Sequence, residues 1–252
     1  MKYPKMIIFD YGHTLLWEPG WDPERGNREL LKYVTKNPGG YSFEEIRRQA
    51  KVIFDEHIMS VRELGLDISG RVGDRVLYEL LGIEFSLTPL EMETVFWDGA
   101  SLGDTMPGTA EMLDYINSKG IRSGVISNLM WSGEALKIRL DRLVPNNKFE
   151  FVMTSSDYLF RKPSKLIFDI AVRKSGLSPD DIWYCGDNPK KDVEGAHDAG
   201  IFPVWYENDV DDRPGREKYD YAPSFELLHI HEWREMICII KMLEKNKEDV
   251  MI

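Results

Sequence analysis

Cysteine is scarce in this sequence, which contains two in 252 residues, Cys185 and Cys238. They lie far apart and lack the spacing of metal ligands, so they predict neither a disulfide framework nor a cysteine-bound metal. This usage fits a reducing compartment. Cys185 falls within an apolar run, and we interpret it as a small buried hydrophobic residue rather than a reactive thiol.

Long apolar runs are missing too. The longest, such as residues 6–9 and 236–240, are far too short to cross a bilayer. The first five residues lead directly into a strand-like run, without the apolar stretch and small-residue cleavage site of a secretory signal. We therefore expect a cytoplasmic protein that has no membrane partner.

Positive charge is in deficit, since the formal net charge is -11 and the sequence pI is about 5.0. Such a surface repels nucleic-acid phosphates, so no nucleic-acid partner is expected. A small anionic substrate stays compatible, because a bound cation and a local lysine can reverse the field inside a pocket. Hydrophobic residues at 42% and charged residues at 30% are typical of a soluble globular protein. The composition gives no indication of oligomeric state.

The first part of the chain predicts one strand followed by helices. Residues 5–9 are apolar after Lys5 and predict a buried strand that ends at Asp10. From about residue 21 to 97 the apolar side chains have helical spacing, which runs through Val34 in the first helix. Ser42 and Glu45 have the spacing of a capping box at the start of the longest helix. We therefore predict a helical insertion over residues 17–100.

The rest of the chain predicts alternating helices and strands after Pro107-Gly108. The predicted strands cover residues 121–127, 151–155, 181–185 and 202–206, and the predicted helices cover residues 110–118, 133–143, 165–174, 190–199 and 225–243. Residues 209–218 predict a charged loop. The alternation indicates an α/β core, residues 1–16 and 101–252, built as a doubly wound parallel sheet. Ligands of such sheets bind at the carboxyl ends of the strands.

Two of the predicted strand ends offer a nucleophile and hydrogen-bond donors. Asp10 follows the first strand, and a carboxylate there can attack phosphorus to form an aspartyl phosphate. Ser127 and Asn128 end a later strand and can donate hydrogen bonds to phosphate oxygens. Each of these residues also has a structural explanation when it is taken singly. Asp10 could be an aspartate of a turn, and Ser127 and Asn128 could cap the helix that follows.

Two further strand ends offer charges. Lys162, in Arg161-Lys162-Pro163-Ser164, can place a compact positive charge against a nucleophile and a phosphate. Asp187 follows Gly186 at a strand end, and Asp192 lies in the next helix; both offer oxygen ligands of the kind that Mg²⁺ prefers. Alone, the lysine would be solvated and the two acids would favour a helix N-terminus.

In this order the four sites resemble the four sequence motifs of the haloacid dehalogenase-like superfamily. The resemblance covers nearly the whole chain and includes Pro107-Gly108 and the run Gly186-Asp187-Asn188, Asp192, Gly195-Ala196, Ala199-Gly200. The helical insertion resembles the α-helical cap of that superfamily. The resemblance implies a Rossmann-like core with an inserted all-helical cap domain.

The resemblance also implies a Mg²⁺-dependent hydrolase and a role for each motif residue. Asp10 is implied as the nucleophile, Ser127 and Asn128 as the groups that hold phosphate oxygens, and Lys162 as the stabiliser of the developing charge. The metal ligands that it implies are Asp10, the backbone carbonyl of Gly12, Asp187 and Asp192.

The first motif departs from the family pattern. Phosphatases of the family usually place a second aspartate two residues after the nucleophile, where it protonates the leaving group and then activates water. Here that position is Gly12, with the register fixed by Thr14. His13 is next to it and titrates in a useful range, so it is a candidate catalytic residue. His13 also occupies a position usually given to glycine, which favours a structural role.

Three hypotheses answer this departure. The first is a phosphatase of small phosphorylated metabolites in which His13 or a cap residue handles the proton, or whose leaving group needs no acid. The second is a phosphonatase-like enzyme with a Schiff base on a cap lysine, for which the candidates are Lys32, Lys36 and Lys51. The third is a slow or non-catalytic relative that binds a phosphorylated ligand.

We favour the phosphatase because the metal and phosphate motifs are otherwise complete. A haloacid dehalogenase also lacks the second aspartate but works without metal, so Asp187 and Asp192 argue against it. Substrate choice is expected to come from the cap, which closes over the strand ends. Four tryptophans near the predicted junctions either line the pocket or simply pack: Trp17, Trp21, Trp97 and Trp131.

Overall fold

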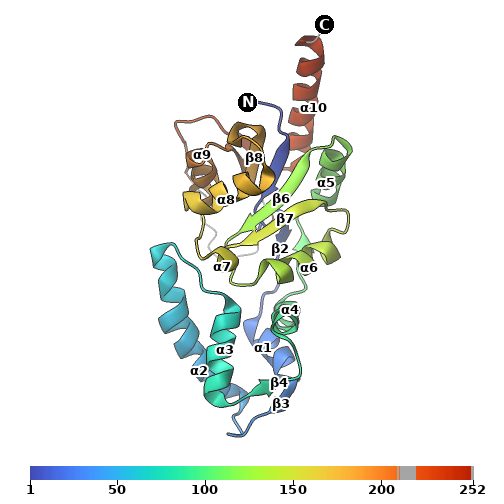
Figure 1. The fold of residues 1–252 in the computed structure, drawn as a ribbon. Coiled ribbons are helices and arrows are strands. Elements are labelled where there is room, and N and C mark those ends of the chain that lie inside the picture. Colours follow the sequence, from blue (N-terminus) through green and yellow to red (C-terminus); the bar gives the residue numbers. More distant parts are fainter. Residues whose placement is uncertain (209, 211–219, 251–252) are drawn as a thin grey trace.

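A six-stranded parallel sheet forms the centre of the molecule (Figure 1). The structure, a computed structural model, describes residues 1–208, 210 and 220–250. The strand order is β10-β9-β8-β1-β6-β7, with β1 between the two halves of the sheet. The strands are β1 (Met6–Phe9), β6 (Arg122–Ser127), β7 (Phe149–Thr154), β8 (Ile182–Gly186), β9 (Phe202–Tyr206) and β10 (Leu228–Ile230).

The alternation of side chains along β1 divides the core into two layers. Met6 and Ile8 point to one face and Ile7 and Phe9 to the other, and all four are 0% exposed. The first face is covered by α8 (Lys165–Ser175) and α9 (Gly195–Asp198), and the second by α5 (Thr109–Ser118), α6 (Gly133–Leu143) and α10 (Trp233–Val250). Helices on both faces of a parallel sheet confirm the predicted doubly wound fold.

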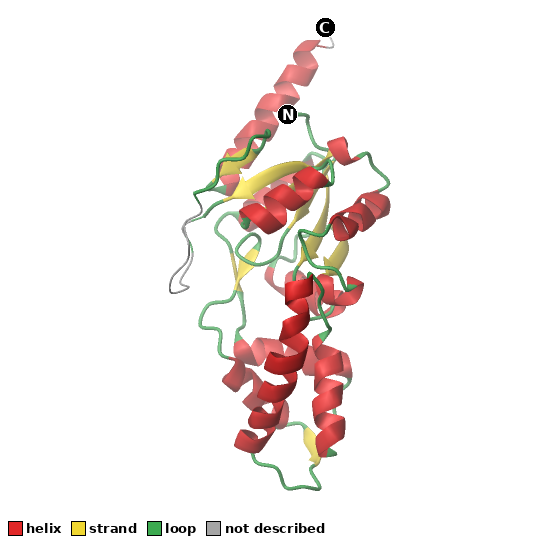
Figure 2. Cartoon of the chain, turned by 90° about the vertical axis from the view of Figure 1, so that its left-hand side faces the viewer, coloured by secondary structure: helices red, strands yellow, loops and turns green. Residues whose placement is uncertain are grey.

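The helical insertion lies at one end of the molecule, beyond the carboxyl ends of the strands (Figure 2). Its helices are α1 (Pro23–Leu31), α2 (Phe43–Lys51), the π-helical η1 (Val52–Ile58), the 3-10-helical η2 (Met59–Leu64), α3 (Gly70–Leu81) and α4 (Pro89–Ala100). The capping box of Ser42 and Glu45 is present and begins the continuous helical run from α2 to η2. The chain passes between the core and the helical insertion twice. The two connecting segments pair with each other as the antiparallel strands β2 (Leu16–Trp17) and β5 (Asp104–Thr105).

Two buried carboxylates hold the helical insertion against the core. Asp67 accepts a hydrogen bond of 2.6 Å from the Ser155 hydroxyl and pairs with Arg161. Glu93 of α4 accepts hydrogen bonds from the backbone and hydroxyl of Ser132, at 2.9 and 2.6 Å. Burying a carboxylate is costly unless it is hydrogen-bonded, so both groups favour this one arrangement of the helices.

The structure corrects several sequence-based boundaries. The helix predicted over residues 225–243 begins at Trp233, because Leu228–Ile230 pairs with β9 as the edge strand β10. Val34 lies in a short strand, β3 (Val34–Lys36), which pairs with β4 (Glu84–Phe85) rather than extending a helix. The helix predicted over residues 190–199 is split into the π-helical η4 (Pro189–Glu194) and α9.

Other expectations can be compared directly with the structure. Apart from residue 210, the predicted charged loop over 209–218 lies outside the described residues. Cys185 is buried as predicted, and burial raises the pKa of its thiol well above the ordinary value. Among the described residues, no helix combines the length and apolar character needed to span a membrane. The remaining connecting helices are α7 (Ser155–Tyr158) and η3 (Pro179–Asp181).

Asp74 in α3 makes stability depend on pH. Burial and the charge of Glu93 raise the pKa of Asp74 to about 7, so the folded state holds this proton more tightly than the unfolded chain. The stabilisation is complete at low pH and is lost as pH rises from about 4 through 7. Asp74→Asn should therefore unfold at higher urea concentration than the wild type at pH 8, with a clearly smaller difference at pH 5. The expected gain is on the order of 1–2 kcal/mol, because water screens a half-buried carboxyl.

Urea titrations at both pH values test this expectation. Asp55→Asn, at an exposed position of η1, is the matched control and should behave like the wild type at both. An equal effect of Asp74→Asn at pH 5 and pH 8 would contradict the assignment.

Candidate active site

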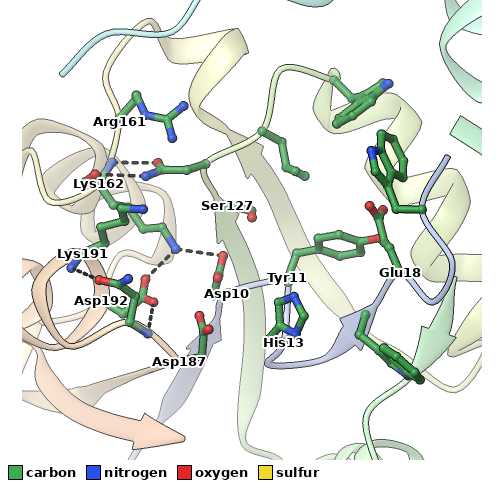
Figure 3. Close-up of a pocket in the computed structure, with 17 residues that line it drawn as sticks. Asp10, Tyr11, His13, Glu18, Ser127, Arg161, Lys162, Asp187, Lys191 and Asp192 are labelled. Carbon is green, nitrogen blue, oxygen red and sulfur yellow. Dashed lines mark hydrogen bonds and ion pairs between the residues drawn. The ribbon is translucent and has the colours of Figure 1, made fainter. Parts of the chain in front are cut away.

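A cleft of about 510 Å³ opens where β1, β6 and β8 end. It is lined by Asp10, Tyr11, Gly12, His13, Trp17, Glu18, Trp21, Ser127, Asn128, Leu129, Trp131, Arg161, Lys162, Asp187, Asn188, Lys191 and Asp192. The residues of the four predicted motifs therefore lie in one place. Figure 3 shows the carboxylate of Asp10 between Lys162 and Asp192 on one side and Tyr11, His13 and Glu18 on the other.

Lys162 is buried at the base of the cleft, where three acceptors surround its ammonium. The Nζ atom lies 2.8 Å from Asp10 Oδ1, 2.6 Å from Asp192 Oδ1 and 2.7 Å from the Tyr184 hydroxyl. Burial opposes the charge, but the two carboxylates outweigh it and raise the pKa of Lys162 above its ordinary value. Burial and Asp192 likewise raise the pKa of Tyr184, which stays a neutral hydroxyl and donates to the carbonyl of Ile126. The site therefore contains a fixed cation next to Asp10.

Asn128 positions Lys162 through its backbone. The Asn128 amide accepts a hydrogen bond of 2.8 Å from the Lys162 N–H and donates one of 3.0 Å to the Lys162 carbonyl. The predicted contact of Asn128 with phosphate stays a prediction, because its amide already holds this loop. Ser127, the last residue of β6, is buried and lines the cleft.

Asp187 and Asp192 follow β8 through a turn that requires glycine. A Cβ on Gly186 would lie 2.3 Å from Asp192 Cγ, so a side chain there would displace Asp192. Asp192 is buried, and its two oxygens bind Lys162 Nζ and the backbone N–H of Asn188 at 2.6 and 2.9 Å. Asp192 thus holds both the lysine and the loop that carries Asp187.

The donor set fits Mg²⁺. One oxygen from each of Asp10, Asp187 and Asp192 lies within 4.8 Å of the others. Three carboxylates lie around one buried ammonium, that of Lys162. Their negative charge exceeds the positive charge of the ammonium, so a bound cation would balance it. Both Asp192 oxygens bind protein donors, which favours a role for Asp192 in holding the lysine and the loop.

The loop after Asp10 turns through a left-handed residue. His13 has φ 55°, a conformation that favours glycine, and its N–H donates to the Leu16 carbonyl at 2.7 Å. Asn208 donates a hydrogen bond of 2.8 Å to the His13 carbonyl. An added Cβ on Gly12 would meet nothing within 4 Å, so steric conflict does not explain the missing second aspartate.

The side of the cleft opposite Lys162 is built from residues near both connections between the core and the helical insertion. Glu18 accepts a hydrogen bond of 2.8 Å from the Tyr11 hydroxyl and another from the Trp97 indole. Buried Arg139 donates to the same hydroxyl at 3.0 Å. Burial raises the pKa of Tyr11 well above its ordinary value. Of the four predicted tryptophans, Trp97 is buried instead of lining the cleft, and it stacks on Trp131 at 4.6 Å.

Sequence reasoning missed four contributors to the cleft. Arg161 was noted only as a neighbour of Lys162, and Lys191 and Glu18 carried no motif. Tyr184 had a usable signal, since a phenol inside a buried strand needs a partner for its hydroxyl. The others depend on how the helical insertion and η4 sit over the sheet, which sequence spacing does not define.

The three lysines considered for a Schiff base do not line the cleft. Lys32 pairs with Glu29 at 2.6 Å, Lys36 pairs with Glu84 at 2.6 Å, and Lys51 is exposed. The structure therefore removes the support for the phosphonatase-like alternative.

Comparison with known proteins agrees with the fold and the motifs. Residues 97–205 match the family model described as haloacid dehalogenase-like hydrolase. A 2-haloacid dehalogenase from Pseudomonas syringae pv. Tomato DC3000 superimposes with a TM-score of 0.62 at 20% identity, covering 95% of this chain and 99% of that one. A phosphatase of the same family from Thermococcus onnurineus gives 0.56 at 21% identity, covering 95% and 98%. The chain therefore shares the fold of these structures, and residues 97–205 are similar to the haloacid dehalogenase-like hydrolases.

Curated relatives are phosphatases and nucleotidases. The glyceraldehyde 3-phosphate phosphatase of Methanothermobacter thermautotrophicus is 36% identical over 100 residues, 39% of this chain and 42% of the relative. The pyrimidine 5'-nucleotidase YjjG of Escherichia coli is 27% identical over 142 residues, 55% of this chain and 59% of the relative. The matches thus span about half the length of these relatives. The family-model match includes Lys162 and Asp187 but begins after Asp10.

Removing the buried ammonium should destabilise the fold. Lys162→Met leaves Asp10 and Asp192 without their cation, and breaking a buried pair in this way costs about 3–5 kcal/mol. Added Mg²⁺ should recover part of this loss in urea unfolding, because it supplies positive charge to the same carboxylates. Lys165→Met, an exposed lysine paired with Asp169, is the control and should change stability by less than about 1 kcal/mol. Equal losses in both variants would contradict the role of Lys162.

Proposed function

We propose that the protein is a Mg²⁺-dependent phosphatase of small phosphate esters that works through an aspartyl-phosphate intermediate on Asp10. The observation that carries the proposal is the meeting of Asp10, buried Lys162 and Asp187 in one cleft. The names of the curated relatives, phosphatases and nucleotidases, support the same reaction class. The helical insertion would act as the cap that covers the cleft, with its proposed limits at residues 17 and 100.

The chemistry divides among the residues as follows. Asp10 attacks phosphorus, the ester bond to the leaving oxygen breaks, and water later hydrolyses the aspartyl phosphate. Lys162 holds the Asp10 carboxylate in place and balances charge that develops on the phosphoryl oxygens. The Ser127 hydroxyl donates to a phosphoryl oxygen. Mg²⁺ bound by Asp10, the Gly12 carbonyl and Asp187 would neutralise charge between the nucleophile and the substrate.

Proton transfer to the leaving group needs a different residue from the usual one. Gly12 has no side chain, whereas His13 and Glu18 line the same cleft and are the candidates. Glu18 accepts hydrogen bonds from Tyr11 and Trp97, so the helical insertion holds it in the cleft. Esters whose leaving group is already a good one need no acid at all.

The substrate is proposed to be a small molecule. A cleft of about 510 Å³ is in the range of small-ligand pockets. Trp17, Trp21 and Trp131 line it and would contact the leaving group, which favours one with an apolar or planar part. A panel that contains glyceraldehyde 3-phosphate and pyrimidine 5'-nucleotides covers the substrate classes of the two relatives.

Phosphate release from p-nitrophenyl phosphate and this panel tests the proposal. Release should require Mg²⁺, stop with chelator, and fall by roughly 10³-fold or more in Asp10→Asn, because no nucleophile remains. Asp169→Asn, a half-buried aspartate of α8 that pairs with Lys165 outside the cleft, is the control and should keep wild-type rates. Metal-independent release, or activity retained in Asp10→Asn, would refute the mechanism.

Restoring a carboxylate at position 12 tests the account of the missing acid. The added Cβ of Gly12→Asp meets no atom within 4 Å, so turnover of esters with poor leaving groups should rise by about 10-fold or more. Hydrolysis of p-nitrophenyl phosphate, whose leaving group needs less protonation, should change little. Gly12→Ala adds the Cβ without the carboxylate and should leave both rates near the wild type. A similar gain in Gly12→Ala would assign the effect to packing rather than proton transfer.

A further inference from the structure

A second group of metal-ligand side chains lies at the same edge of the sheet, outside the cleft. Glu207 follows β9, His229 lies in β10 and His231 follows it. The two imidazole rings lie next to each other, with their centroids 4.7 Å apart. One ligand atom from each of the three residues lies within 4.8 Å of the other two.

The spacing of this group is close to that of a bound transition metal. His229 Nε2 and Glu207 Oε2 are 3.0 Å apart. Tetrahedral zinc with ligand bonds of ~2.0–2.1 Å places neighbouring ligand atoms about 3.3 Å apart. A shift of a few tenths of an ångström would therefore convert the present contact into a pair of ligands. Both side chains are partly exposed, at 39% and 27%, which leaves them accessible to an ion.

The surroundings also orient the His231 imidazole in the way that metal-binding imidazoles are oriented. His231 Nδ1 lies 2.7 Å from the Glu207 carbonyl oxygen. A carbonyl only accepts, so Nδ1 carries the proton and the other nitrogen of a neutral ring keeps its lone pair. The His229 ring stacks on Trp205 at 4.0 Å with an angle of 6° between the planes. A surface ion pair of Glu207 and His229 would not need His231 in this orientation.

We propose that Glu207, His229 and His231 bind a zinc ion, with water in the remaining position. Two imidazoles and a carboxylate suit zinc, whereas the carboxylates of the cleft suit Mg²⁺, so the two sites differ in the metal they select. The two ligand sets share no residue. A zinc ion here would join the end of β9 to the edge strand β10, which is followed by α10.

Calorimetric titration of the full chain with ZnCl₂, in buffer that contains excess Mg²⁺, tests the site. The wild type should bind one zinc ion per chain, and His229→Ala and His231→Ala should each weaken binding by about 10-fold or more. His57→Ala, an exposed histidine of η1, and Cys238→Ser, an exposed thiol of α10, are the controls and should bind as the wild type does. Asp187→Asn should also retain zinc binding, since it alters only the cleft.

A stability measurement keeps the test independent of damage to the fold. Zinc should raise the melting temperature of the wild type, because it binds the folded state. Glu207→Gln keeps the side-chain volume and should melt within about 2 °C of the wild type without zinc, but it should lose the zinc-induced rise. Equal zinc affinity in the wild type and the double variant His229→Ala/His231→Ala, or loss of binding only in Asp187→Asn or Cys238→Ser, would overturn the proposal.

Discussion

The buried ammonium of Lys162 is the interaction on which the cleft depends. The ammonium donates hydrogen bonds to Asp192 and Tyr184 and forms an ion pair with Asp10. These three residues come from the end of β1, from η4 and from β8, so one cation connects three separate segments. In a low-dielectric site a charge left without partners is costly, and the arrangement is therefore cooperative. The position of this lysine also determines where the Asp10 carboxylate lies.

Backbone constraints provide the precision that the charges alone lack. Asn128 fixes the Lys162 peptide through two hydrogen bonds, and Gly186 allows Asp192 to approach the end of β8. The left-handed turn at His13 leads the chain from Asp10 into β2. A histidine in this conformation is strained relative to glycine, which gives a physical reason for the glycine that the family pattern usually has at this position.

The core could be predicted from sequence because its strands are short apolar runs that end in polar residues. Met6 to Phe9, followed by Asp10, contains both the buried strand and the chemistry at its end. The same reasoning was wrong at Leu228–Ile230. The apolar spacing there predicts a helix, but the segment forms a strand because it pairs with β9. It could not reach Arg161 or Glu18, whose partners Asp67 and Trp97 belong to the helical insertion. Contacts between distant segments leave no periodic signal in the sequence.

The two groups of metal-ligand residues, one in the cleft and one at β10, are connected at the carboxyl ends of the strands. Each connection is made by one hydrogen bond. The Trp205 indole donates to the Asp187 carbonyl at 3.2 Å while its ring stacks on His229. Asn208, the neighbour of Glu207, donates to the His13 carbonyl. An ion held by Glu207 and His229 would therefore restrain Trp205 and Asn208. Trp205 contacts Asp187, and Asn208 contacts the loop that follows Asp10. Binding free energies coupled in this way are reciprocal, so magnesium in the cleft would alter zinc affinity by the factor with which zinc alters magnesium affinity.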